Sequence, residues 1–213
     1  MSYDMQRKAR PSAPHGGSRG GLFRMLTVLS VWGMVPPVLC HAAPSTTAIP
    51  APGAKDSRTD LVARLAHAQS AQEAALIRQA LEELRLKPVR PATQLLVRRA
   101  TRELGEDKPA DAIEDMGAAL ALQSDVAALW RMRAQTRLSG GDAQGAISDL
   151  GEALQRDPED AQSWQTLTSA EEAAGANDAA LKAWEHVMAL DPLMPGATKT
   201  YDKLKLKAYG QPT

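Results

Sequence analysis

Apolar residues recur at helical spacing from about residue 59 to residue 209. Between Asp60 and Leu86 two such patterns follow one another and predict a helical hairpin. Their apolar faces are formed by Leu61, Val62, Leu65 and Ala66 and by Ala74, Ile77, Leu81 and Leu84. Ser70 followed by Glu73 predicts a capping box at the start of the second helix. A last helix, from about Ala197 to Tyr209, presents four lysines and suits the end of a helical stack.

The N-terminal part of the chain has a different pattern. Residues 1–24 are polar and basic, an apolar run extends from Met25 to Leu39, and the small residues Ala42 and Ala43 follow. This order is typical of a Sec-type signal peptide, since the run is shorter than the roughly 20 residues of a membrane span. We expect cleavage of residues 1–43 on export to the periplasm, after Ala42 or Ala43. An uncleaved inner-membrane anchor and a cytoplasmic protein with a later start are the alternatives.

Residues 44–58 contain several Pro, Ser, Thr and Ala residues and no apolar face, so they predict a flexible linker. The lone cysteine, Cys40, lies in the predicted signal peptide, where the residues before it fit a lipidation motif poorly. The exported chain would then be free of cysteine, which suits an oxidising compartment.

The C-terminal half of the chain repeats itself, with equivalent residue types recurring at a period of 34. The pairs at this spacing are Trp130 and Trp164, Gly141 and Gly175, Ala146 and Ala180, Leu150 and Trp184, Asp157 and Asp191, and Pro158 and Pro192. Residues 93–126 are a weaker copy, in which Leu96 stands for the Trp, Asp107 for the Gly and Ser124 for the Pro.

Residues 127–160 and 161–194 resemble the tetratricopeptide repeat (TPR) at these positions. The resemblance implies an all-α fold, a right-handed α-solenoid of antiparallel helical hairpins. We expect about three TPR units within residues 59–209, an N-terminal hairpin, a C-terminal capping helix and a short tail at 210–213.

Each repeat position has a physical role. Trp130 and Trp164 supply apolar area between helices, and small residues such as Ala146 and Ala180 let helices approach closely. Gly141 and Gly175 end the first helix of a unit, where a positive φ suits glycine. Pro158 and Pro192 close the unit. The basic residues Arg99 and Arg133 fall at a position that is usually apolar, and we expect their charged ends to pair with Glu or Asp.

Composition and charge narrow the function. Apolar residues make up 44% of the chain and aromatic residues 4%, which favours helices over sheets. The formal net charge of +0 gives no global attraction to nucleic acid. We find no catalytic motif, no phosphate loop and no histidine at metal-ligand spacing, so the sequence predicts no enzyme, no metal and no cofactor.

A protein or peptide is therefore the expected partner. In TPR arrays the first helix of each unit lines a concave groove, and the resemblance carries this role to particular residues. They are Gln94, Arg98 and Thr101, then Arg131 and Gln135, then Gln162, Gln165 and Ser169. A carboxylate held between Arg98 and Arg131 is one interpretation of this pair, and two solubilising residues on a helix surface are the other. The Asn and Lys residues of the chaperone-binding carboxylate clamp are missing, which puts binding of a chaperone C-terminus in doubt.

The function that we expect is a non-catalytic scaffold in the bacterial cell envelope, with a peptide or protein segment in the groove and a monomeric mature domain. A membrane-anchored or self-associating structural protein is one alternative. A regulator of an envelope enzyme is another.

Overall fold

The computed structural model describes residues 57–210, so the predicted signal peptide and nearly all of the predicted linker lie outside the described residues. Regular structure in the described part is entirely α-helical. The helices are α1 (Arg58–Ala66), α2 (Ala71–Leu86), α3 (Pro91–Gly105), α4 (Pro109–Leu122), α5 (Ala127–Ser139), α6 (Ala143–Arg156), α7 (Ala161–Ala173), α8 (Asn177–Leu190) and α9 (Ala197–Tyr209). The predicted all-α fold is confirmed.

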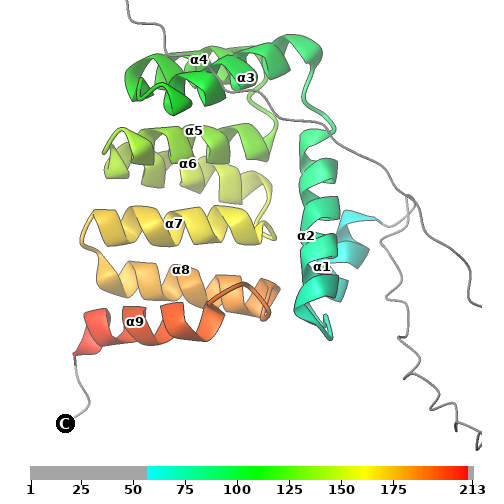
Figure 1. Ribbon diagram of the computed structural model, residues 1–213, viewed down its shortest axis with the longest axis vertical. Coiled ribbons are helices and arrows are strands. Elements are labelled where there is room, and N and C mark those ends of the chain that lie inside the picture. The colour runs from blue at the N-terminus through cyan, green and yellow to red at the C-terminus, as the bar shows by residue number, and fades with distance from the viewer. Residues whose placement is uncertain (1–56, 211–213) are drawn as a thin grey trace, which may run out of the picture. The chain divides into compact units, whose positions relative to one another are not determined.

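Helices α3 to α9 form a stack in which each helix packs against the one before it (Figure 1). The hairpins α3–α4, α5–α6 and α7–α8 coincide with the three repeat units, and α9 covers α8 at the end of the stack. Small residues at the helix contacts, such as Ala146 and Ala180, are fully buried. The arrangement is an α-solenoid, as the repeat predicts.

A residue with positive φ follows the first helix of every hairpin in the stack. Gly141 and Gly175 have φ of 83° and 79°. In the first hairpin the equivalent residue is Asp107, with φ of 59°, and it is the one non-glycine residue of the described part whose φ is positive. The first repeat therefore has the same kind of turn, with Asp in place of Gly.

The two repeat tryptophans make the same contacts one period apart. The indole N–H of Trp130 donates to the Ser124 carbonyl, and that of Trp164 donates to the Pro158 carbonyl, each at 2.8 Å. The two acceptors are themselves equivalent residues of successive repeats. Trp164 also stacks on His186, with 3.9 Å between ring centroids. Each tryptophan therefore fixes the loop before its own helix to the helix itself.

Arginines at the usually apolar position pair with aspartates, as predicted. Arg99 binds Asp115, and Arg133 binds Asp149 at 2.6 Å. Both pairs join the two helices of one hairpin, and both aspartates are buried. In the third repeat Leu167 and Ala183 occupy these two positions, so the arginine and the aspartate are lost together. An ion pair in two repeats is thus replaced by two apolar residues in the third.

The N-terminal hairpin forms where the sequence predicts it. Ser70 accepts from the Glu73 N–H at 3.1 Å, but the Glu73 carboxylate accepts from the Gln69 N–H and not from Ser70. The predicted capping box is therefore only half correct. A complete capping box, which the sequence analysis did not identify, opens α1 between Ser57 and Asp60.

The position of this hairpin is not encoded by the repeat. Helix α2 does not stack on α3 but runs along the stack, beside the ends of α5, α7 and α8 (Figure 1). The apolar residues of α1 and α2 form a core of their own, against which Leu190 and Leu193 pack. We call α1 and α2 together the strap.

One position of the repeat contacts the strap, or the segment that follows it, in each of the three repeats. Gln123, Asp157 and Asp191 are the C-caps of α4, α6 and α8, recur once in each repeat and are all buried. Asp191 binds Arg78 at 2.7 Å, and Asp157 binds Arg85 at 2.8 Å. Gln123 accepts from the Arg90 N–H and donates to the Pro88 carbonyl, in the segment that follows α2.

Candidate functional site

The first helices of the three hairpins, α3, α5 and α7, carry the residues that the sequence assigns to a concave groove. Exposed among them are Gln94, Arg98 and Thr101 on α3, Gln135 on α5, and Gln165 and Ser169 on α7. Gln162 is half-buried, and Arg131 is buried. The predicted residues therefore divide into six exposed residues and two, Arg131 and Gln162, that are buried or half-buried.

Arg131 is covered because the strap supplies its partner. Its guanidinium binds Glu82 of α2 at 2.7 Å and Asp160 at 3.0 Å, and it donates to Gln162 at 2.8 Å. Only 3% of Arg131 is exposed. A buried charge that is already neutralised and hydrogen-bonded gains little from a further carboxylate. The predicted Arg98/Arg131 carboxylate site is therefore corrected to Arg98 alone.

A cleft of about 240 Å³ lies between the end of the strap and the helices α3 and α5. Its lining residues are Leu86, Val89, Gln94, Val97, Arg98, Leu129 and Met132. Nearly all the accessible surface of this cleft is apolar, and the Gln94 amide is turned to the Val89 carbonyl at 2.9 Å. The cleft is large enough for an apolar side chain and offers it the thioether of Met132, which adapts readily to different shapes.

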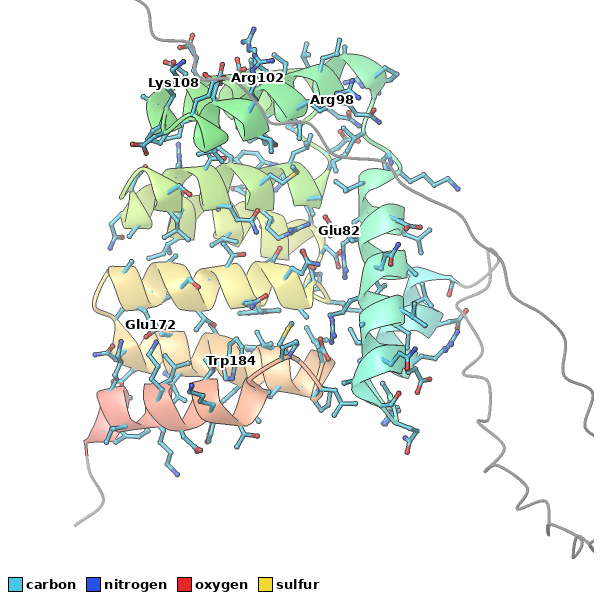
Figure 2. All side chains as sticks on the ribbon, viewed as in Figure 1. Glu82, Arg98, Arg102, Lys108, Glu172 and Trp184 are labelled. Carbon is cyan, nitrogen blue, oxygen red and sulfur yellow. The ribbon has the colours of Figure 1, made fainter. Side chains whose placement is uncertain are left out.

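Arg98, labelled in Figure 2, is one of the residues that line this cleft. It makes no hydrogen bond or ion pair with any of residues 57–210. An arginine presents five N–H donors in a planar fork that fits a carboxylate. The geometry therefore combines an apolar recess with a cation that no described residue neutralises, an arrangement that suits an apolar residue next to an acidic one.

The remaining exposed groove residues carry amides and hydroxyls. The Thr101 hydroxyl donates to the Val97 carbonyl at 2.9 Å, and the Ser169 hydroxyl donates to the Gln165 carbonyl at 3.4 Å. Their oxygen atoms are left as acceptors on the surface, and the Gln135 amide bonds Thr166 only loosely, at 3.4 Å. Such groups are suited to hydrogen bonds with a peptide backbone.

Sequence reasoning missed Leu86 and Val89 as lining residues, because they belong to the strap and its connection and lie outside the repeat. Val97 and Met132, which also line the cleft, belong to the repeat helices α3 and α5. Among the described residues, no three His, Cys, Asp or Glu side chains form a group that could hold a metal ion. None of the described helices is long and apolar enough to cross a membrane.

Comparison with solved structures finds TPR domains. The first TPR domain of Spaghetti (RPAP3), bound to the HSP90 peptide SRMEEVD, is 19% identical and superimposes with a TM-score of 0.51. The superposition covers 55% of this chain and 94% of that one. The Sgt2 TPR domain from Aspergillus fumigatus is 19% identical, with a TM-score of 0.51 over 58% of this chain and 87% of its own. The Arabidopsis OM64 TPR domain is 18% identical, with a TM-score of 0.50 over 54% and 94%.

A little over half of the chain therefore has the fold of a TPR domain, a class of helical solenoid. No protein-family profile matches the chain, and no curated protein matches it in sequence. The likeness to the solved structures defines the fold.

Proposed function

We propose that this chain is a non-catalytic protein-interaction module that binds an extended peptide segment along α3, α5 and α7. The observation that carries the proposal is the apolar cleft with Arg98 among its lining residues, a cation left without a partner among residues 57–210. An apolar side chain of the ligand occupies the cleft, an acidic group pairs with Arg98, and the exposed amides of Gln135 and Gln165 bond the backbone.

Peptide binding by similar structures supports this reading. The Spaghetti (RPAP3) domain was solved with an HSP90 peptide whose sequence, SRMEEVD, places acidic residues beside apolar ones. The TPR2AB domain of yeast Sti1, with a TM-score of 0.50, was solved in an HSP90 complex. The ligand of this chain belongs to the same chemical class of acidic, partly apolar segments. It need not be a chaperone terminus, because Asn and Lys are missing from the clamp positions.

A display library of random heptapeptides tests the proposal on the purified protein. We expect enrichment of sequences with an Asp or Glu beside a large apolar residue, and a loss of affinity of about tenfold or more in Arg98→Glu. Lys182→Glu on α8 is the charge-matched control, since Lys182 is exposed and lies outside the cleft. Enriched peptides that bind Arg98→Glu as well as the control would contradict the assignment.

The setting that we propose is the bacterial periplasm, and its support is the signal-peptide pattern of residues 1–43. Mass spectrometry of the protein recovered from separated periplasmic and membrane fractions reports its N-terminus. A periplasmic chain that starts near Ala43 is the expected result. A membrane-bound chain with an intact leader would support an anchored protein instead.

A further inference from the structure

The first hairpin of the stack leaves one side of α3 uncovered. Leu95, Leu129 and Ser163 are equivalent residues of α3, α5 and α7, each one repeat further along the chain. Leu95 is 62% exposed, whereas Leu129 and Ser163 are fully buried. In α5 and α7 the preceding helices, α4 and α6, provide the cover.

Two more positions show the same difference. The side chain of Arg102 is 66% exposed, while the equivalent Thr136 and Ala170 are buried. Arg99 and Arg133 are equivalent arginines, and each pairs with an equivalent aspartate. Their side chains are nevertheless 52% and 18% exposed. The open side of α3 is therefore a docking face of the repeat that has lost its neighbouring helix, because α2 runs along the edge of the stack as the strap.

This end face, formed by Leu95, Leu96, Arg98, Arg99 and Arg102, is a shallow hollow on the surface. Arg98 and Arg102 lie along its length at one end of the stack (Figure 2). Leu95 and Leu96 offer apolar contact, and no described residue pairs with Arg98. Within the described part Arg102 reaches only Glu106, at 3.8 Å and on the exposed surface, where an ion pair contributes little. The end face is thus both apolar and positively charged.

Charge decides which occupant fits. A second copy stacked end to end would bring α9 to this face, and α9 carries Lys199 and Lys205 against the single acid Asp202, besides Lys203 and Lys207, which pair with Glu172. Two copies joined through α3 would oppose their own arginines. Like charges brought together at an interface oppose both arrangements. An acidic helix meets neither objection, and its apolar stripe would cover Leu95 as α4 covers Leu129.

We propose that the end face of α3 binds an amphipathic α-helix of a partner protein, with Asp or Glu beside an apolar stripe, in the place that a preceding repeat helix would occupy. The bound helix packs its apolar stripe on Leu95 and Leu96 and directs its carboxylates to Arg98 and Arg102. This surface shares Arg98 with the groove cleft and is otherwise lined by other residues, so a peptide in the groove and a helix at the end of the stack would share that one cation.

Site-specific photocrosslinking in the producing cells tests this inference. A photoreactive benzoylphenylalanine replaces the exposed Leu95, and a matched chain carries it at Lys182 on α8. We expect an adduct at position 95 whose crosslinked segment, sequenced by mass spectrometry, is an acidic amphipathic helix. The adduct falls at least tenfold with Arg102→Glu and is retained with Arg102→Lys.

Several outcomes would overturn the inference. They are an adduct with a second copy of the chain, with another part of the same chain, with lipid or with a basic segment, and no adduct above that at position 182. Arg102 does not line the cleft, so Arg102→Glu leaves heptapeptide binding in the groove unchanged. Failure at the end face and failure of the groove can therefore be told apart.

Discussion

The guanidinium of Arg78 binds both carboxylate oxygens of Asp191, at 2.7 and 3.0 Å, across 113 residues of sequence. Seven residues further along α2, Arg85 binds one carboxylate oxygen of Asp157, in the previous repeat, at 2.8 Å. Seven residues span two helical turns, or roughly 10.5 Å. Two arginines that lie two turns apart on α2 therefore bind two aspartates that lie one full repeat apart in the solenoid.

Loss of one of these arginines should loosen the strap. Arg78→Ala leaves Asp191, which is fully buried, without its cation, and we expect a loss of about 3–5 kcal/mol in the free energy of unfolding. Urea unfolding measures the loss, and hydrogen exchange shows whether α2 is the part that opens. Arg102→Ala is the control, expected to change stability by less than about 0.5 kcal/mol because Arg102 is exposed.

The Arg133–Asp149 pair should be replaceable by Leu and Ala, the residue types at the equivalent positions 167 and 183 of the third repeat. Asp149→Ala alone leaves Arg133 and Arg137 without their buried acceptor, and Arg133→Leu alone removes one of the two partners of Asp149. We expect the double variant to be at least about 1 kcal/mol more stable than the sum of the single losses predicts. Additive losses in a thermal or urea double-mutant cycle would show that Leu167 and Ala183 are not an equivalent substitute.

The turns after α3 and α5 predict opposite effects of introducing and of removing glycine. Gly141→Ala should destabilise by about 1–2 kcal/mol, purely through its positive φ, since an added Cβ would meet no atom within 4 Å. Asp107→Gly should stabilise by about 0.5–1 kcal/mol for the same reason. Thermal unfolding measures both. A stabilising Gly141→Ala would mean that this backbone conformation is not required.

Acid should release the C-terminal helix. Burial of Glu172 favours its neutral form, but the ammonium groups of Lys207 and Lys203 outweigh this and hold the pKa below its ordinary value of 4.5. A lowered pKa means that the contribution to stability is complete above about pH 4.5 and is lost as the pH falls through the pKa in the folded chain. Hydrogen exchange of α9 at pH 3 and pH 7 measures it, and in Glu172→Gln this part of the pH dependence should be absent.

Much of the fold follows from local patterns in the sequence. The repeat period places six helices and their turns, because each repeat residue acts within its own hairpin or on the next one. Even the paired charges of Arg99 and Arg133 were predictable, since a charged residue at a buried position needs an opposite charge nearby. The strap helices were predictable as helices for the same local reason.

Contacts between distant segments were not predictable. Nothing in the pattern of α2 shows that Arg78 and Arg85 bind repeat C-caps, since Asp157 and Asp191 also fit the ordinary end of a repeat helix. Placement of the strap in turn decides that Glu82 neutralises Arg131 and that Leu86 and Val89 line the cleft. The surroundings of the groove residues next to the strap therefore needed the structure, while the repeat alone predicts Gln94 and Arg98, which line the cleft.

A solenoid of stacked hairpins is normally elastic, because small changes in the rotation between neighbouring repeats alter its curvature. The strap binds two successive repeats through Asp157 and Asp191 and thereby fixes the distance between them. The second and third repeats then cannot spread or close on a ligand without stretching a helix. Binding along α5 and α7 loses little configurational entropy from the receptor, so this part of the surface should select its ligands by fit and not by wrapping around them.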